Sequence, residues 1–461
     1  MALIKSISGT RGTIGGRVGD NLTPIDIVAA AAAYGQWLKK VTPRPKVVIG
    51  RDARISGQLV QTLVMQTLVA QGVDIVDLGL STTPTVEVMV THLDAQGGII
   101  VTASHNPRQW NALKFLNAKG EFISAAEGEL LLKLTGKKVT FADVDSFGTI
   151  STHQTAIDEH IQMVLALPLV TVEAIRARKF KVVVDPVNSS GAIAVPPLLE
   201  ALGCEVVLIH GETHGDFAHN PEPLPEHLSD LSKAVVSARA HLGIAVDPDV
   251  DRLAFVSEKG EMFGEEYTLV TVADYILRSE KGATVSNLSS TRALRDVTEL
   301  ADCQYFASAV GEVNVVEKMK EVGAVIGGEG NGGIIYPPLH YGRDALVGIA
   351  LFLSQLAEYG KSVTMLRNTF PDYYISKNKI ELSPSVDLNG IMAFLEEKYR
   401  RAATINTVDG LKIEFDRDWI HLRKSNTEPI IRVYAESVSV VIAENLIAKI
   451  MSDIREYLHK R

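Results

Sequence analysis

A unit of strand, turn, amphipathic helix and strand recurs along this chain, and it constrains the fold more than any other feature. The first copy begins at Lys46 and the second at Lys181, and in each a Ser-Gly pair follows the first apolar strand. A weaker third copy begins near Ala283. Strands that alternate with helices favour parallel or mixed sheets with the helices packed on their faces. The repeats therefore predict three successive α/β domains.

The pattern changes after about Phe370. Short strands are expected within 377–385, 410–415, 419–425 and 430–437, with one helix among them and another from about Ser439. Strands that follow one another with few helices between them favour an antiparallel sheet. We therefore predict a small C-terminal α+β domain.

Length and composition exclude several classes of protein. A chain of 461 residues is too long for one hydrophobic core. Its net charge of −9 argues against nucleic-acid binding. Cys204 and Cys303 stand far apart among apolar or aromatic neighbours, which is typical of reduced thiols. No apolar run approaches the roughly 20 residues of a membrane span, and the N-terminus lacks the pattern of a signal peptide. We expect a soluble cytoplasmic protein.

The first chemical motif is TASHNP, at the end of an apolar strand. It contains Ser104, His105 and Asn106, with Lys114 ten residues after the serine. A turn at a strand end exposes the serine hydroxyl, which needs a base or a metal ion to become a nucleophile. Lys114 could hold a phosphate or move a proton. A purely structural turn in which Ser104 bonds the backbone is the alternative.

The second motif, DPDVDR, places Asp247, Asp249 and Asp251 at alternate positions after an apolar strand. Three carboxylates this close repel one another unless a cation binds them, and they suit Mg²⁺. An EF-hand would also use these positions, but Arg252 stands where its glycine belongs and the flanking segments read as strands. An aspartate nucleophile at a strand end stays open as a second alternative.

The third motif, GEGNGG, is a glycine-rich loop that carries Glu329 and Asn331. Glycines let a backbone approach a ligand closely, and a carboxylate with an amide can bind the vicinal hydroxyls of a sugar. The spacing matches neither the P-loop nor the dinucleotide-binding fingerprint. Taken alone, such a glycine-rich loop is more often a structural turn than a binding site.

The fourth motif, RKSNTEP, joins two strands and concentrates hydrogen-bond donors. A phosphate clamp is predicted there because guanidiniums, hydroxyls, an amide and backbone N–H groups surround one turn. A hairpin with exposed arginines is the alternative. The residues of the predicted clamp are Arg423, Ser425, Asn426, Thr427 and Arg432.

Near the N-terminus, Arg11 lies in the segment SGTRG and could orient a hydroxyl or a phosphate.

These four motifs, in this order, resemble those of the α-D-phosphohexomutase superfamily over essentially the whole chain. The resemblance implies three related mixed α/β domains and a C-terminal α+β domain similar to the TATA-binding protein, arranged around a central cleft. It also assigns a role to each domain. The expected boundaries are 1–153 for the phosphoserine domain, 154–253 for metal binding, 254–369 for sugar binding and 370–461 for phosphate binding.

The resemblance also implies the role of each site residue. Ser104 would carry the phosphoryl group and contact the metal, with Lys114, Arg11 and His105 assisting catalysis. The three aspartates would bind Mg²⁺. The implied substrate contacts are Arg252, Glu329, Asn331, Arg423, Ser425, Asn426, Thr427 and Arg432.

The reaction follows from these roles. Phosphoserine 104 would phosphorylate the free hydroxyl of a hexose phosphate, and the resulting 1,6-bisphosphate would turn over and return its other phosphate. We expect a monomer or homodimer.

The glycine-rich loop departs from the pattern of many bacterial members of the family. Those members have Ser at the position of Asn331 and His at the position of Gly333. This chain therefore lacks that histidine as an acid or base, and His340 is a candidate to replace it. The opening segment and 309–319 resemble the phosphoglucosamine mutase branch, whereas SNTEP is more usual in phosphomanno/phosphoglucomutases.

Of the family's substrates, the resemblance leads us to expect glucosamine phosphate. A phosphomannomutase or phosphoglucomutase is the first alternative. A non-catalytic protein that binds sugar phosphates and a phosphatase with an aspartyl nucleophile are the others.

Overall fold

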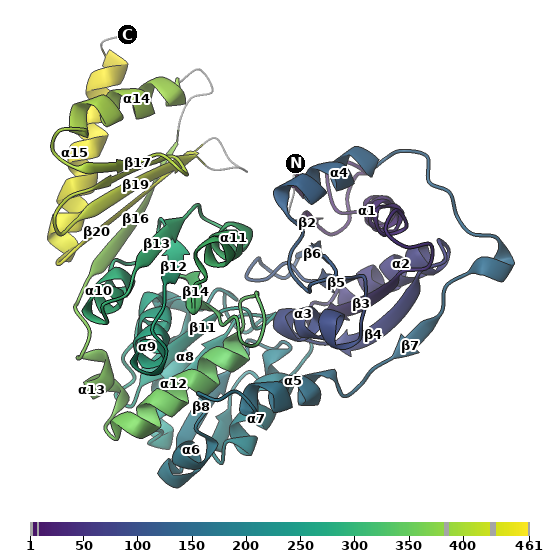
Figure 1. Ribbon diagram of the computed structural model, residues 1–461, viewed down its shortest axis with the longest axis horizontal. Coiled ribbons are helices and arrows are strands. Elements are labelled where there is room, and N and C mark those ends of the chain that lie inside the picture. The colour runs from purple at the N-terminus through teal and green to yellow at the C-terminus, as the bar shows by residue number, and fades with distance from the viewer. Residues whose placement is uncertain (1–2, 7–8, 382–386, 425–429, 460–461) are drawn as a thin grey trace.

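The recurring unit of the sequence folds as three α/β domains of one topology, followed by an antiparallel α+β domain (Figure 1). The computed structural model describes residues 3–6, 9–381, 387–424 and 430–459. Within these residues, the mixed α/β class with a C-terminal α+β domain is confirmed.

The first domain is built on a sheet in the order β1-β2-β6-β5-β3-β4-β7. Its strands are β1 (Ile4–Ser6), β2 (Gly9–Thr13), β3 (Lys46–Arg51), β4 (Asp74–Leu80), β5 (Gly97–Val101), β6 (Trp110–Leu116) and β7 (Ile150–Thr152). Its helices are α1 (Pro24–Leu38), α2 (Gly57–Val69), α3 (Thr83–His92) and α4 (Ala125–Leu134). The strands β3, β4 and β5 are parallel, so their carboxyl ends share one edge of the sheet.

The second domain repeats the central part of this topology with the sheet order β11-β10-β8-β9. Its strands are β8 (Lys181–Asp185), β9 (Glu205–Leu208), β10 (Leu242–Val246) and β11 (Leu253–Ser257). Its helices are α5 (Ala156–Leu165), α6 (Val172–Arg178), α7 (Gly191–Ala201) and α8 (Ser229–Ala238). Only β11 runs antiparallel to its neighbour, and the tight turn before it carries the three aspartates.

The third domain has the corresponding sheet order, β15-β14-β12-β13. Its strands are β12 (Thr284–Asn287), β13 (Tyr305–Ser308), β14 (Ile326–Glu329) and β15 (Gly333–Ile335). Its helices are α9 (Glu265–Ser279), α10 (Ala293–Leu300), α11 (Glu312–Val322), α12 (Ala345–Tyr359) and α13 (Val363–Arg367). In all three domains a strand, helix and strand precede an antiparallel hairpin in the same spatial order, which confirms that they are related.

The second and third domains share one hydrophobic core. Helix α12 is apolar around its whole circumference and is buried from Ala345 to Ala357, as expected of a helix enclosed by other elements. Phe352 of this helix stacks on Phe255 of β11, with ring centroids 3.7 Å apart. The first domain has a separate core around Tyr34 and Phe115.

The C-terminal domain is an antiparallel sheet in the order β16-β20-β19-β18-β17, with two helices on one face (Figure 1). Its strands are β16 (Tyr374–Glu381), β17 (Thr404–Asn406), β18 (Leu411–Glu414), β19 (Trp419–Lys424) and β20 (Ile430–Ser437). Its helices are α14 (Leu388–Tyr399) and α15 (Val440–His459). Apolar residues of both helices and of the strands form its core, which confirms the expected α+β domain.

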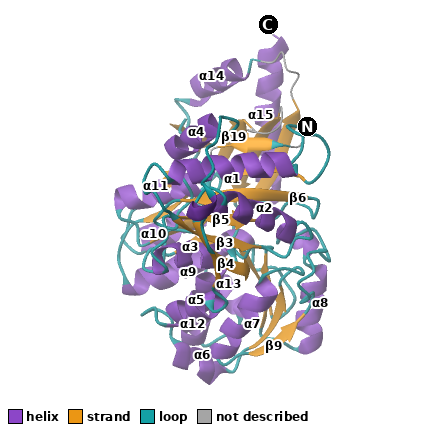
Figure 2. Ribbon diagram, turned by 90° about the vertical axis from the view of Figure 1, so that its right-hand side faces the viewer, coloured by secondary structure: helices purple, strands orange, loops and turns teal. Residues whose placement is uncertain are grey.

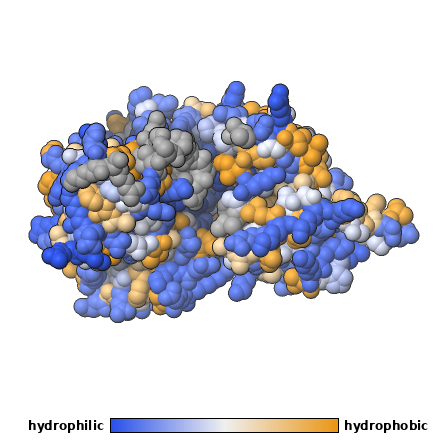
Figure 3. Space-filling model, turned by 90° about the horizontal axis from the view of Figure 1, so that it is seen from above, coloured by the Kyte–Doolittle hydropathy of each residue, from blue (hydrophilic) through white to orange (hydrophobic). Residues whose placement is uncertain are grey.

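The domains lie around a hollow. The first domain lies on one side, and the other three lie one after another along the opposite side (Figure 1). Helices α15 and α6 mark the two ends of that row (Figure 2). Seen from above, the surface is hollowed between the two sides (Figure 3). Among the described residues, no helix combines the length and apolarity that a membrane crossing requires.

Candidate active site

Ser104 lies in a strained turn directly after β5. Its φ of 48° falls in the left-handed region, which residues with a side chain seldom adopt. Arg54 holds the turn, because its Nη2 donates hydrogen bonds to the carbonyl oxygens of Ser104 and Asn106. The guanidinium is itself buried and pairs with Asp52 Oδ2 at 3.0 Å. The buried ion pair of Arg54 with Asp52 therefore stabilises this turn.

The serine hydroxyl reaches the aspartate turn of the second domain. Ser104 Oγ donates a hydrogen bond of 2.7 Å to Asp247 Oδ2. Asp247 Oδ1 accepts the backbone N–H groups of Asp251 and Arg252, each at 3.1 Å, which fixes the shape of the turn. Strands β10 and β11 flank this turn as an antiparallel hairpin, so the EF-hand alternative is excluded.

Two carboxylate oxygens of the aspartates, Asp249 Oδ1 and Asp251 Oδ1, are buried and find no hydrogen-bond partner among the described residues. Lys114 Nζ donates to Asp249 Oδ2 at 2.8 Å, and Thr83 Oγ1 donates to the same oxygen at 2.6 Å. One oxygen from each of the three aspartates lies within 4.8 Å of the other two. Hard divalent cations prefer such oxygen sets, so these residues fit a metal ion.

Burial and mutual repulsion shape the titration of the aspartates. Burial, together with the neighbouring carboxylates Asp249 and Asp251, raises the pKa of Asp247 well above its usual range. Burial acts in the same sense on Asp249, but the charge and hydrogen bond of Lys114 outweigh it and lower the pKa of Asp249. Lys114 thus compensates the charge of Asp249, whereas Asp247 needs a further cation, such as a bound metal ion, to ionise.

Arg343 joins the metal-binding turn to the sugar loop, and it is a residue that the sequence motifs did not identify. Its Nη2 donates to Asp251 Oδ2 at 2.7 Å, its Nη1 to Glu329 Oε2 at 3.0 Å, and its Nε to Glu312 Oε2 at 3.1 Å. Burial by itself would lower the pKa of Arg343, but these carboxylates outweigh it and raise the pKa well above its usual range. A single arginine in a loop has no periodic pattern that would reveal such contacts.

The glycine-rich loop presents Glu329 in a fully bonded state. Glu329 Oε1 accepts hydrogen bonds from Asn287 Nδ2 at 2.8 Å and from the backbone of Gly311 at 3.0 Å. Burial by itself would raise the pKa of Glu329, but the charge of Arg343 outweighs burial and lowers the pKa, which keeps the carboxylate ionised. Asn331 Oδ1 accepts from the backbone N–H of Gly333 at 3.2 Å.

Arg343, rather than His340, lies against Gly333. A Cβ atom at Gly333 would stand 2.3 Å from Arg343 Cδ. The aliphatic part of the Arg343 side chain therefore fills the space that a side chain at position 333 would need. His340 instead lies with Nε2 3.2 Å from Asp344 Oδ2 and with Nδ1 3.4 Å from Glu87 Oε2. These contacts give no support to His340 as a substitute for the missing histidine.

Glu266 lies under the glycine-rich loop, where a Cβ atom at Gly330 would approach Glu266 Oε2 to 1.9 Å. Burial raises the pKa of Glu266 to about 8, although Lys377 opposes the shift. The folded protein thus holds a proton that the unfolded chain releases at about pH 4.3. The raised pKa of Glu266 therefore contributes fully to the free energy of unfolding below about pH 4.3, and this contribution is lost as the pH rises through about 8.

The variant Glu266→Gln should therefore flatten the pH dependence of stability. We expect the free energy of unfolding of the unmodified protein to fall more steeply between about pH 5 and pH 8 than that of the variant. Urea unfolding at several pH values measures this difference. The exposed Glu261→Gln serves as the control and should keep the original slope. Equal slopes for Glu266→Gln and the unmodified protein would contradict the prediction.

Cationic side chains surround the Ser104 turn. Arg11 Nη1 donates to Asn106 Oδ1 at 2.9 Å, and Arg252 Nη1 pairs with Glu222 Oε1 at 2.9 Å. His105 Nδ1 lies 3.4 Å from Ser104 Oγ. Burial, with the charges of Arg252 and Arg11, lowers the pKa of His105 well below its usual range, so the ring is neutral.

The predicted phosphate clamp is only partly described. Arg423 of β19 and Arg432 of β20 stand directly opposite each other in the antiparallel register. Like charges in that position are unfavourable without a counter-ion, although Asp409 Oδ2 pairs with Arg423 Nε at 2.9 Å. Ser425, Asn426 and Thr427 lie outside the described residues.

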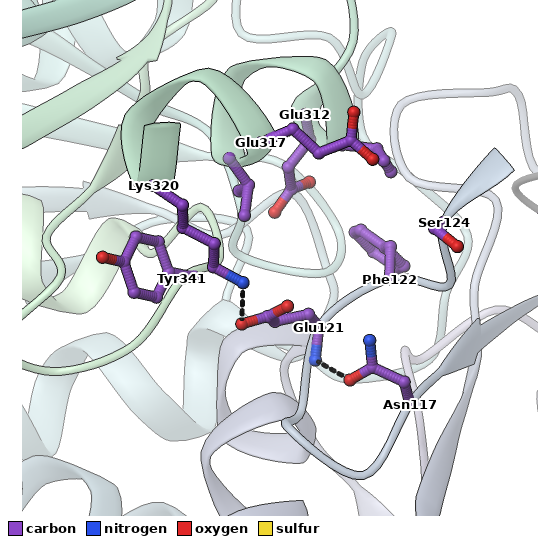
Figure 4. Close-up of a pocket in the computed structure, with 10 residues that line it drawn as sticks. Asn117, Glu121, Phe122, Ser124, Glu312, Glu317, Lys320 and Tyr341 are labelled. Carbon is purple, nitrogen blue, oxygen red and sulfur yellow. Dashed lines mark hydrogen bonds and ion pairs between the residues drawn. The ribbon is translucent and has the colours of Figure 1, made fainter. Parts of the chain in front are cut away.

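A small pocket opens beside this site, between the first and third domains. Figure 4 shows Lys320 of α11 pointing at Glu121 of the first domain, and the ammonium of Lys320 pairs with the carboxylate of Glu121. Glu312 lines the same pocket and also binds Arg343. The two domains thus meet through paired charges at the edge of the site.

The structure thus brings Ser104, Lys114 and the three aspartates into direct contact across two domains. Arg11, His105 and Arg252 surround that centre, and Glu329 connects to it through Arg343.

Comparison with protein-family models finds matches along most of the chain. Models described as phosphoglucomutase/phosphomannomutase alpha/beta/alpha domains I, II and III match residues 5–139, 158–260 and 264–374. The C-terminal domain of the same family matches residues 386–452.

Curated relatives match over almost the whole chain. A probable phosphoglucosamine mutase of Methanopyrus kandleri is 33% identical over 95% of this chain and 95% of its own. A phosphoglucomutase/phosphomannomutase of Thermococcus kodakarensis is 33% identical over 93% of this chain and 94% of its own. A crystal structure of a phosphoglucomutase/phosphomannomutase family protein from Burkholderia thailandensis superposes with a TM-score of 0.84 at 26% identity, covering 99% of this chain and 96% of its own.

Proposed function

Since the chain belongs to the phosphoglucomutase/phosphomannomutase family, we propose that it interconverts hexose 1-phosphates and 6-phosphates by carrying a phosphoryl group on Ser104. The resemblance to phosphohexomutases inferred from the motifs is thereby confirmed. The observation that carries the proposal is the hydrogen bond of 2.7 Å from Ser104 Oγ to Asp247 Oδ2, beside two unpartnered carboxylate oxygens. A serine joined to an acidic metal site is what phosphoryl transfer needs.

The transfer can be written with its atoms balanced. A free hydroxyl oxygen of the substrate attacks the phosphorus of phosphoserine 104, and the bond between phosphorus and Ser104 Oγ breaks. The hydroxyl proton leaves to a nearby base, and the product is a hexose 1,6-bisphosphate. The reverse step at the other phosphate restores phosphoserine 104. Positioning and charge compensation, rather than covalent chemistry of the protein, carry most of such a transfer.

The residues around Ser104 support these steps. The neutral ring of His105 places Nδ1 3.4 Å from Ser104 Oγ, where it can exchange the hydroxyl proton. Lys114 and Arg11 add positive charge on two sides of the turn. Asp247, Asp249 and Asp251 would hold Mg²⁺. When bound, this ion supplies positive charge that offsets the charge developing on the transferred group.

The substrate contacts form the rest of the proposal. Glu329 and Asn331 would bind sugar hydroxyls, with Arg252 beside them. The oppositely placed Arg423 and Arg432 of the C-terminal domain would clamp the phosphate that does not react, together with Ser425, Asn426 and Thr427. Since Glu329 is engaged by Arg343 and Asn287, sugar binding must compete with or rearrange these bonds.

Glucosamine phosphate is our preferred substrate. The names of the relatives support a hexose phosphate and divide between glucosamine and glucose or mannose. The test compares kcat/KM for glucosamine 1-phosphate, glucose 1-phosphate and mannose 1-phosphate, with Mg²⁺ and the matching bisphosphate. We expect the highest value with glucosamine. A higher value with glucose or mannose would overturn this choice of sugar, and isomerisation of none of them would overturn the mutase itself.

Removal of the metal should abolish turnover. We expect a chelator to reduce activity to background, because the transferred group then loses the cation that neutralises its developing charge. Readdition of Mg²⁺ should restore the rate, and coupled assays before and after dialysis measure it. Full activity in the chelated protein would contradict the assignment of the aspartates.

We propose that the protein acts in the cytoplasm as a monomer or homodimer. Light scattering after size-exclusion chromatography measures the assembly, and a larger oligomer would contradict this part of the proposal.

A further inference from the structure

A second cluster of metal-binding side chains lies in the second domain, apart from the three aspartates. Asp185 ends β8, and its carboxylate is almost fully buried. Its Oδ2 lies 3.1 Å from His210 Nδ1 and 3.1 Å from His219 Nε2. The two histidines lie in the loop that follows β9, and their side chains are 23% and 17% exposed. Two imidazoles thus converge on one carboxylate oxygen, with one side open to solvent.

The hydrogen bonding of His219 fixes where its ring protons lie. Its Nδ1 is 2.7 Å from the backbone carbonyl oxygen of Asn220, which only accepts, so Nδ1 carries a proton. In the neutral ring Nε2 then directs its lone pair at Asp185. That arrangement is repulsive unless a cation lies between the two atoms or the ring takes up a second proton. Histidines that bind metals characteristically donate their other N–H to a backbone carbonyl.

The spacing and the chemistry of the ligands agree with a transition ion. Bonds of 2.0 to 2.1 Å in a tetrahedral shell separate the ligand atoms by about 3.3 Å. The two distances to Asp185 Oδ2 are each 3.1 Å, and all three ligand atoms lie within 4.8 Å of one another. Two nitrogens and one oxygen suit Zn²⁺, whereas Mg²⁺ prefers oxygens alone. We propose that Asp185, His210 and His219 form a second metal site for a divalent transition ion such as Zn²⁺, with a water as fourth ligand.

The segment that carries the two histidines continues toward the Ser104 turn. Phe217 lies under the guanidinium of Arg54, with its ring centroid 5.0 Å from Cζ. Asp216 pairs with Arg108, and Glu222 pairs with Arg252. A metal ion at Asp185 would hold this segment to the sheet, and the segment in turn packs against the arginine that braces Ser104.

The test measures Co²⁺ binding to the full chain, stripped of metal and then saturated with Mg²⁺ so that the three aspartates are occupied. We expect one equivalent of Co²⁺ to bind, with the visible absorption of a tetrahedral ion, and Zn²⁺ to displace it. His219→Gln and His210→Gln should each weaken binding by more than about tenfold. His214→Gln is the control on the same loop, because its ring accepts the N–H of Asp216, and the variant should bind Co²⁺ as the unmodified protein does.

Two further measurements make the result decisive. Asp247→Asn should keep the absorption, since that residue belongs to the other site. Circular dichroism of each histidine variant establishes that it is folded. Absence of Co²⁺ absorption in the Mg²⁺-saturated protein would overturn the proposal and leave a plain ion pair at Asp185. Loss of the absorption in Asp247→Asn, or its retention in a folded His219→Gln, would also overturn it.

Discussion

Replacing Ser104 by alanine should lower kcat by more than about 10⁴-fold, the size of effect that loss of a covalent nucleophile produces. The hydroxyl has no substitute in its turn, because Oγ is the atom that reaches Asp247. The variant should also fail to take up phosphate from a hexose 1,6-bisphosphate, as measured by intact mass. Turnover is measured with the preferred sugar phosphate and Mg²⁺.

The comparison of three variants separates the mutase from its main rival. Ser237→Ala, at an exposed position on α8, is the matched control and should keep full activity. Asp247→Asn should lose activity in either mechanism. If Ser104→Ala stays active while Asp247→Asn is inactive, an aspartyl-phosphate or phosphatase mechanism is favoured, and the phosphoserine proposal is wrong.

The fold could be predicted largely from repetition. Each copy of the unit supplies a parallel pair of strands joined by a helix, and local hydrophobic periodicity is enough to reveal it. The weak third copy near Ala283 proves to be β12, α10 and β13, in the same spatial order as the other two. The shared core of the second and third domains could not be predicted, because it depends on contacts such as Phe255 with Phe352 that lie far apart in sequence.

The centre of the site was predictable for a topological reason. Ser104 and the three aspartates each follow a strand, and ligand sites of α/β sheets lie beyond the carboxyl ends of strands. That two such edges from different domains meet was known only through the family resemblance. The structure adds the hydrogen bond between Ser104 and Asp247.

The supporting residues could not be predicted from motifs. Arg54 binds backbone carbonyls about fifty residues away, at Ser104 and Asn106. Single arginines and histidines in loops leave no periodic trace, and their partners are chosen by the tertiary fold. The same reason hid the convergence of His210 and His219 on Asp185. Sequence motifs thus identified the residues at the centre of the candidate site better than the residues that hold them in place.

Removing the guanidinium of Arg343 should have the second large effect. Arg343→Ala leaves Asp251, Glu312 and Glu329 buried around an empty space. Breaking a buried ion pair by removing one partner typically costs about 3 to 5 kcal/mol of stability, since the remaining charge has lost its compensation. Arg343→Lys should recover part of the loss, because a compact ammonium restores the charge but lacks the planar, spread-out N–H groups of the guanidinium. Urea unfolding with and without Mg²⁺ measures both variants.

The exposed pair of Arg400 with Glu397 provides the control, since both side chains are more than half exposed. Arg400→Ala should change stability by less than about 1 kcal/mol. Arg343→Ala should in addition weaken Mg²⁺ binding and turnover together, because Asp251 is then free to rotate away from the other aspartates. If Arg343→Ala loses stability but keeps its Mg²⁺ affinity and kcat, the arginine is a structural bridge between the domains and has no part in shaping the metal site. If Arg343→Ala keeps its stability, its Mg²⁺ affinity and its kcat, the buried network around Arg343 does not form in solution.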